Sequence, residues 1–324
     1  MNTEPTAERP TESALLRRLR DGEFALTAEI TPPVSGGAQV LLDKALPLKG
    51  HVDAINLTDG ASARVHMSSL ASSAILIANG MEPVMQVTCR DRNRIALMAD
   101  LLGAAALGVH NLLLLQGDDP TAGDQPMAKP VFDLASMELI EVAATMSSEG
   151  VLPSYGASKT GGEPELTRLP ITEPPRFFVG AADMPSAVAN PSWLAKVRQK
   201  AAAGARFVQT QLCYDMDVIA KYAANLHAEG LTENLFFLIG NGPLASVKSA
   251  IWMRDNLYGV IIPDAIIARL DGAKDAKAEG IKICIEQLQE MSTLPGIAGA
   301  HLMAPINTAS IPEVVAGAKI DNRT

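Results

Sequence analysis

The sequence predicts an α/β protein, a single-domain TIM barrel in which eight parallel strands alternate with helices. Short apolar runs alternate with helical patterns along nearly all of the 324 residues. Ala, Leu, Ile and Val dominate these runs, whereas aromatic residues make up only 4% of the chain. Such a composition suits parallel strands, which are buried on both faces, and an undivided barrel commonly reaches this length.

The expected strands are apolar runs that end at turn-forming or polar residues. They cover residues 24–30, 52–58, 83–88, 111–116, 176–181, 206–212, 235–240 and 297–303. Helical patterns cover residues 92–108 and 193–205, with Gly108 and Gly204 at the expected C-caps. Residues 259–270 hold a weaker β-like run, in which Pro263 predicts entry into a helix.

Two segments depart from the alternating pattern. Residues 1–20 are expected to be a polar N-terminal extension without the apolar core of a signal peptide, so the barrel is assigned to residues 21–324. Residues 153–175 are rich in Pro and Gly, and predict a surface excursion or lid.

A doubly wound open sheet is the alternative fold. Its dinucleotide loop would be "GNGPLA" at residues 240–245, which follows a strand and fits G-x-G-x-x-A. Pro243 and the position in the seventh strand unit favour an ordinary strand-to-helix loop instead.

The net charge and the cysteine content limit the classes of protein to which this chain can belong. The net charge of −9 argues against a nucleic-acid partner, which needs a basic surface. The three cysteines lie far apart, which predicts neither disulfides nor zinc but a reducing cytoplasm. The five histidines lack metal-ligand spacing, and no apolar run reaches the roughly 20 residues of a membrane helix.

Polar residues at the C-terminal ends of the strands are the candidate site, because barrel active sites lie there. Glu29, Thr58 and Asp118 end strands, and the amides Gln86 and Gln211 accompany them. We expect carboxylates and amides at this mouth, with no histidine or lysine among them.

Glu29 is the strongest candidate for a catalytic residue. Its apolar neighbours favour the protonated carboxyl group that a general acid needs, while an ion pair with Lys or Arg is the alternative. Asp118 directly follows its strand and Gly117, whereas Asp119 is expected to cap the following turn.

Five motifs carry a family resemblance. In order, "ALTAEITPP", "NLTDGAS", "VTCRDRN", "LLLLQGDDP" and "FVQTQLCYD" resemble methylenetetrahydrofolate reductases over about residues 20 to 310. The resemblance implies a TIM barrel that reduces 5,10-methylenetetrahydrofolate to 5-methyltetrahydrofolate. It implies NAD(P)H as electron donor, usually acting through FAD at the mouth, and a small-molecule folate as substrate.

The resemblance also implies residue roles. Glu29 matches the acid that opens the folate ring, and Asp118 matches the aspartate beside pterin and flavin. Gln211 matches a pterin-binding glutamine, and Thr58 a threonine near the flavin. Met253 is a further candidate substrate contact, although its apolar character predicts a core position.

The departures from the family concern flavin-contacting positions. Gln86 stands where bacterial members have His, Gln116 where they have Arg, and Ala182 where they have Tyr. Trp193 and Gln199 replace an aspartate and an arginine, while Lys200 is retained. These positions predict either altered flavin binding or direct hydride transfer from NAD(P)H to the folate.

Two other functions compete with reduction. One is a folate-dependent methyltransferase or demethylase on a related barrel, for which an iminium-forming acid is not required. The other is a non-catalytic folate-binding subunit, which would bind the folate without turnover. The sequence predicts no oligomeric state.

Overall fold

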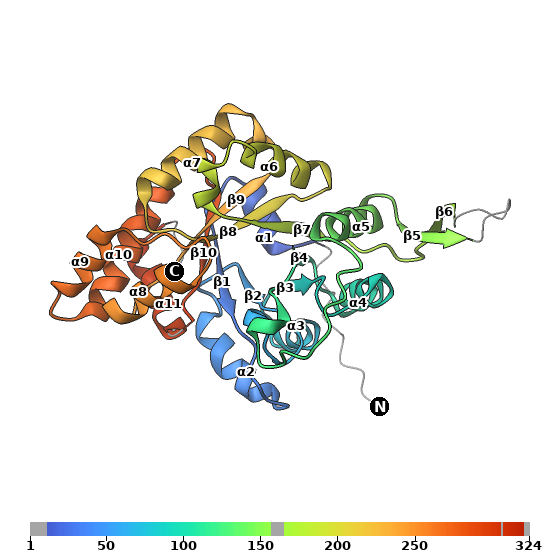
Figure 1. Cartoon of the computed structure of the whole chain (residues 1–324), viewed down its shortest axis with the longest axis horizontal. Helices are drawn as coiled ribbons and strands as arrows, with labels where there is room; N and C mark the ends of the chain where they lie inside the picture. The colour runs from blue at the N-terminus through green and yellow to red at the C-terminus, as the bar shows by residue number, and fades with distance from the viewer. Residues whose placement is uncertain (1–11, 157–164, 306, 321–324) are drawn as a thin grey trace.

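Eight parallel strands close into a barrel in the computed structural model, which describes residues 12–156, 165–305 and 307–320. Around the barrel the order is β1-β10-β9-β8-β7-β4-β3-β2, so the first and last strands meet (Figure 1). The strands are β1 (Ala25–Ile30), β2 (Ala54–Leu57), β3 (Pro83–Thr88), β4 (Asn111–Leu115), β7 (Phe178–Asp183), β8 (Phe207–Leu212), β9 (Phe236–Asn241) and β10 (Gly299–Leu302). The predicted TIM barrel is confirmed, and all eight predicted strands lie within two residues of these bounds.

Helices cover the outside of the barrel (Figure 1). They are α1 (Ala14–Arg20), α2 (Ala38–Ala45), α3 (Ser69–Ala78), α4 (Arg94–Leu107), α5 (Ser136–Ser148), α6 (Trp193–Ala202), α7 (Met216–Ala228), α8 (Val247–Asn256), α9 (Asp264–Asp271), α10 (Ala276–Met291) and α11 (Ile311–Ala318). Gly108 ends α4 with φ 89°, and α9 begins after Pro263, both as predicted. Among the described residues, no helix is both long and apolar enough to cross a membrane.

The doubly wound alternative is wrong, because the sheet is closed. In "GNGPLA" the first glycine, Gly240, belongs to β9. A Cβ on Gly242 would lie 2.1 Å from the carbonyl oxygen of Met303. Close packing between β9 and the end of β10 therefore explains this glycine without a bound dinucleotide.

The lower interior of the barrel is an apolar floor. Inward-facing side chains from seven strands form it, namely Ala25, Ala54, Val84, Leu113, Phe178, Phe207 and Leu238. The Phe178 and Phe207 rings stack with their centroids 4.7 Å apart. Gly180 is needed beside them, because a Cβ there would lie 2.2 Å from the Phe207 ring.

Helix α1 completes this floor. Leu15 and Leu19 are 0% and 3% exposed and pack against the floor cluster. The first N–H groups of α1 are satisfied by Glu82, which accepts hydrogen bonds from the backbone of Ala14 (2.8 Å) and Leu15 (3.1 Å). Residues 14–20, which the sequence analysis assigned to the N-terminal extension, therefore form a helix that packs against the barrel floor.

The Pro- and Gly-rich excursion contains a hairpin that the sequence did not predict. Strands β5 (Val151–Gly156) and β6 (Glu165–Pro170) pair antiparallel and project from the barrel beyond α5 (Figure 1). All six residues of β6 are exposed, so no buried face imposes an alternating pattern on its sequence. Residues 157–164 of the excursion lie outside the described residues.

The three cysteines are buried and free of disulfides, as their spacing predicted. Burial raises the pKa of the Cys89 thiol to about 11 and that of Cys213 to about 12. They are packing residues rather than nucleophiles, because the thiolate is the reactive form.

Substitution of Leu15 by Ala tests the contribution of α1 to the floor. We expect the free energy of unfolding to fall by about 2–5 kcal/mol, because the change leaves a cavity in the floor cluster. Denaturant titration of the purified variant measures it. Arg17→Ala is the control on the exposed face of the same helix, and an equally small effect of both changes would contradict a structural role for α1.

Candidate functional site

Glu29 lies near the C-terminal end of β1, at the mouth of the barrel. Its Oε2 accepts a hydrogen bond of 2.8 Å from Nε2 of Gln86, and Nε2 of His301 lies 3.6 Å from the same oxygen. The side chain is 24% exposed, so it is reachable from the mouth. In the described part of the chain no Lys or Arg forms an ion pair with Glu29, so the alternative of a carboxylate paired in this way is not found among these residues.

His301 is the site residue that sequence reasoning missed. It lies on β10, is 2% exposed, and places Nδ1 at 2.9 Å from Oγ1 of Thr27. Thr27 and His301 are register partners, because β1 and β10 close the barrel. The prediction of a site without histidine is therefore wrong, because His301 approaches Glu29 from the buried layer below the mouth. The available signal was the position of His301 inside the strand-like run "IAGAHLM".

A layer of hydrogen-bonded side chains lies beneath Glu29. Gln209 donates from Nε2 to Oγ1 of Thr27 (2.9 Å) and to Oδ1 of Asn56 (3.0 Å). Asn56 donates in return to Oε1 of Gln209, at 2.6 Å. All of these groups are buried, so the layer satisfies polar groups that would otherwise be costly inside a barrel.

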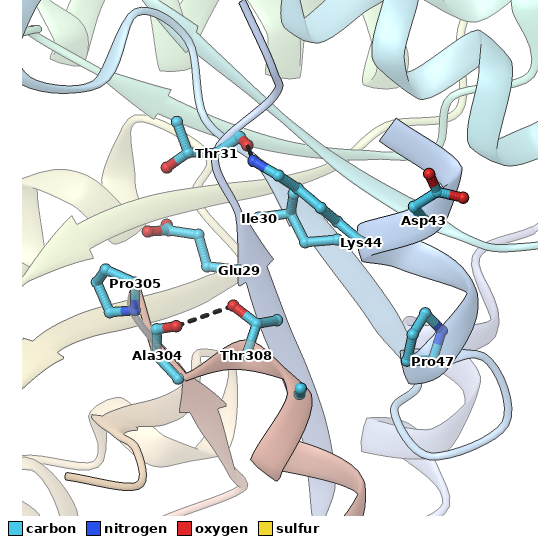
Figure 2. Close-up of a pocket in the computed structure, with 10 residues that line it drawn as sticks. Glu29, Ile30, Thr31, Asp43, Lys44, Pro47, Ala304, Pro305 and Thr308 are labelled. Carbon is cyan, nitrogen blue, oxygen red and sulfur yellow. Dashed lines mark hydrogen bonds between the residues drawn. The ribbon is translucent and has the colours of Figure 1, made fainter. Parts of the chain in front are cut away.

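A pocket of about 310 Å³ opens beside Glu29. It lies between the end of β1, helix α2, and the segment after β10 that leads into the short helix η6 (Thr308–Ser310). Figure 2 shows Glu29 among the lining residues, together with Lys44, whose Nζ donates to the carbonyl oxygen of Thr31 at 3.1 Å. Glu29 thus approaches the buried His301 through Oε2 and is also one of the residues that line this cavity.

Asp118 follows β4 but faces a different loop. It is exposed, and its Oδ2 accepts a hydrogen bond of 2.9 Å from the backbone N–H of Ser62. Ser62 and Ala63 have φ of 54° and 53°, a left-handed conformation that is costly for residues other than glycine. Gly117 has φ 92°, as expected of a residue that turns the chain at the mouth. Asp118 therefore holds a strained loop in place beside the mouth.

Asp119 caps the next turn, as predicted. Its Oδ1 accepts hydrogen bonds from the backbone N–H (2.9 Å) and the hydroxyl (2.8 Å) of Thr121. These two hydrogen bonds lower the pKa of the Asp119 carboxyl group.

The two amides at predicted flavin positions are engaged within the protein. Gln86 donates to Glu29, as described above. The Oε1 of Gln116 accepts a hydrogen bond of 3.0 Å from the backbone N–H of Ser136, at the first turn of α5. Thr58 differs from them, because its buried Oγ1 has no hydrogen-bond partner among the described residues. Such an atom is suited to a bound ligand.

Lys200 is likewise engaged with the protein. Its Nζ donates to the carbonyl oxygen of Ala182 (2.7 Å) and to Oδ1 of Asp183 (3.1 Å). The other oxygen of Asp183 accepts from Nε1 of Trp193 (2.9 Å) and from the hydroxyl of Tyr222 (2.8 Å). Burial, and then the adjacent Asp183, raise the pKa of Tyr222 well above its usual value, so the hydroxyl remains a donor. These contacts form a structural network between β7, α6 and α7.

Gln211 and Met253 hold the far side of the mouth. Gln211 donates from Nε2 to the carbonyl oxygen of Tyr258 (3.2 Å) and accepts at Oε1 from the backbone N–H of Leu212 (2.9 Å). Met253 is 8% exposed and packs with Leu212 in a core cluster, as its apolar character predicted. Its alternative role as a substrate contact stays a prediction, and little of its surface is accessible.

The chain is similar to a known family along most of its length. The family model described as methylenetetrahydrofolate reductase matches residues 14–162 and 164–319. A probable methylenetetrahydrofolate reductase (NADH) of Oryza sativa subsp. japonica is 26% identical over 294 residues, which are 87% of this chain and 46% of the relative. Methylenetetrahydrofolate reductase (NADH) 1 of Arabidopsis thaliana is 25% identical over 293 residues, again 46% of the relative. The chain therefore spans about half the length of the curated relatives it matches.

A solved structure shares the fold. It is an uncharacterized protein from Clostridium thermocellum that binds two copies of 5-methyl-5,6,7,8-tetrahydrofolic acid. The two chains superpose with a TM-score of 0.61 at 13% identity, over 94% of this chain and 98% of the other. At that identity the likeness supports the fold alone.

Substitution of Lys200 by Met tests whether this lysine stabilises the fold. We expect the free energy of unfolding to fall by about 1–3 kcal/mol, because a largely buried Asp183 loses its cationic partner. Thermal or denaturant unfolding measures the change. Lys196→Met, an exposed position of the same helix, is the matched control, and equal stability of the two variants would show that the Lys200 contacts contribute nothing.

Proposed function

The chain belongs to the methylenetetrahydrofolate reductase family, and on this premise we propose that it reduces 5,10-methylenetetrahydrofolate to 5-methyltetrahydrofolate with a reduced nicotinamide cofactor. The carrying observation is a carboxyl group, Glu29, at the mouth of a barrel that matches the family over nearly its whole length. Two further findings support the proposal. The curated relatives are named as NADH enzymes, and the Clostridium thermocellum structure binds the molecule that would be the product here.

Glu29 is proposed as the general acid. The substrate carries its one-carbon unit in a five-membered ring, and ring opening requires a proton on the departing nitrogen. The C–N bond then breaks with its electron pair going to nitrogen, which leaves an iminium carbon that can accept hydride. Glu29 is suited to this step because it is accessible from the pocket and is not neutralised by a Lys or Arg ion pair among the described residues.

Asp118, Thr58 and Gln211 are proposed as folate- or cofactor-contacting residues. Asp118 is an exposed carboxylate at the mouth, where it can stabilise the positive charge of the iminium. Thr58 offers a hydroxyl that the protein leaves unpaired. Gln211 is half-exposed and fixed by the backbone, so its amide is held rigidly for a ligand.

We propose that hydride passes directly from the nicotinamide to the iminium. FAD is the expected family cofactor, but the predicted flavin positions other than Thr58 do not fit it well, because their side chains are engaged within the protein or apolar. Gln86 and Gln116 are bonded to Glu29 and to α5, Lys200 is bonded to Asp183, and Ala182 offers no polar side chain. Direct transfer asks only that donor and acceptor be stacked closely.

The spectrum of the purified protein tests the direct route. We expect no stoichiometric flavin absorption, and NADH oxidation with methylenetetrahydrofolate that does not rise when FAD is added. Bound flavin in a one-to-one ratio, or activity that depends on added FAD, would contradict direct transfer while leaving the reductase proposal intact.

Substitution of Glu29 by Gln tests the reductase mechanism itself. We expect the rate of folate-dependent NADH oxidation to fall by about 10²–10⁴-fold, because the amide cannot supply the proton. Glu290→Gln, on the exposed face of α10, is the control. Full activity of the Glu29 variant would eliminate the acid role. Methyl transfer from 5-methyltetrahydrofolate without NADH would favour the methyltransferase alternative.

A further inference from the structure

The surroundings of Glu29 distinguish its two carboxyl oxygens. Both contacts in the described structure converge on Oε2, the hydrogen bond from Gln86 at 2.8 Å and the approach of His301 at 3.6 Å. No hydrogen bond from a described residue reaches Oε1. The residue also lines the pocket at the mouth, so an oxygen without a hydrogen-bond partner among the described residues belongs to a side chain that a ligand can reach.

The neighbours of His301 favour one tautomer of its ring. Oγ1 of Thr27 already accepts a hydrogen bond from the Gln209 amide, so the single proton of the Thr27 hydroxyl is free to be donated. Nδ1 of His301 lies 2.9 Å from this oxygen. A hydroxyl oxygen can accept two hydrogen bonds, so this contact alone fits either tautomer. Nε2 lies 3.6 Å from a carboxyl oxygen of Glu29, and the tautomer with its proton on Nε2 gives each ring nitrogen a complementary neighbour, a hydroxyl donor at Nδ1 and a carboxyl acceptor at Nε2.

The orientation of Gln209 is itself fixed by a second amide. Asn56 and Gln209 exchange two hydrogen bonds, at 2.6 and 3.0 Å, and turning only one of them would bring two donors or two acceptors together. The hydrogen bonds of the layer therefore form one connected chain, from Asn56 through Gln209 and Thr27 to His301.

We infer that His301 is a positioning residue for Glu29, one that selects Oε1 as the oxygen that delivers the proton. This inference rests on the proposed function. Two N–H groups, from Gln86 and His301, face Oε2 and leave no acceptor for a proton on that oxygen. The acid proton of Glu29 is thereby confined to Oε1, which accepts no hydrogen bond from a described residue.

The step balances as a single proton transfer. The Oε1–H bond of Glu29 breaks and an N–H bond forms on the departing folate nitrogen. The ring C–N bond breaks with its electron pair going to that nitrogen. The resulting carboxylate is stabilised by the hydrogen bond from Gln86 and by the electrostatic attraction of the nearby Nε2–H of His301, both in place before the reaction begins. His301 neither gains nor loses a proton.

Two amide replacements of His301 separate positioning from packing. The Nε2 of Gln can take the place of the imidazole Nε2 toward Glu29, whereas the amide of Asn reaches only the place of Nδ1, toward Thr27. We expect His301→Gln to retain most of kcat, and His301→Asn to lose about 10- to 100-fold in kcat with little change in the KM for the folate. His227→Asn, on an exposed turn of α7, is the matched control.

The outcomes discriminate because both variants remove the same ring. Rescue by Gln alone, with equal melting temperatures for the two variants, supports positioning. Equal losses of kcat in both variants that parallel a loss of stability would overturn it, as would an Asn variant with wild-type kcat.

A second measurement does not depend on activity. Nitrogen NMR of protein labelled at histidine, with the His301 signals assigned by their loss in the Gln variant, reports which ring nitrogen is protonated. We expect a proton on Nε2 and none on Nδ1 in the protein without substrate. The opposite tautomer would overturn the inference. A wild-type protein with the expected tautomer and no reductase activity would instead refute the proposed function.

Discussion

Polar side chains inside a closed barrel must find partners on other strands, because the strands leave little room for water there. Asn56, Thr27, Gln209 and His301 meet this condition through hydrogen bonds across β2, β1, β8 and β10. Each of these bonds constrains the next, so the layer acts as one unit rather than as separate pairs. The orientation of Glu29 depends on it, since His301 is the last member of the layer and the first neighbour of the carboxyl group.

In the barrel interior, the residues that stabilise the fold and the residues proposed for chemistry lie at different heights along the barrel axis. The floor is apolar, is closed by α1, and holds the stacked Phe178 and Phe207 rings. The polar layer above it has no direct access to solvent and fixes orientation. The mouth carries the exposed or half-exposed groups, Glu29, Asp118 and Gln211. A residue's place along its strand therefore indicates its task, in keeping with barrel enzymes generally.

Sequence patterns were sufficient for the barrel and for the position of Glu29. Strands buried on both faces leave apolar runs whose ends are polar, and Glu29 and Asp118 stand at such ends. The same reasoning missed α1, because a seven-residue helix with two buried leucines is too short to show helical periodicity. It missed the β5–β6 hairpin because exposed strands need no alternation.

His301 and the engaged amides were missed for a different reason. The closure of the barrel decides which of the five histidines approaches Glu29. It brings Thr27 and His301 into contact, although they are 274 positions apart in the sequence. Local patterns contain no such information. In the same way, Gln116 could be recognised as a departure from the family, but its contact with the first turn of α5 follows only from the fold.

Gln86 links the two unusual features of the site. By the family resemblance it replaces a histidine that contacts flavin, and in the structure its amide donates to Glu29. One substitution can therefore weaken the hold on a flavin and at the same time add an N–H group to the acid. On the proposed function these effects belong together. An enzyme that moves hydride directly from a nicotinamide no longer needs a flavin contact on β3, but it still needs a carboxyl group whose proton is directed at the folate. Gln86 thus supplies a hydrogen bond to the acid at a position where a flavin contact is no longer required.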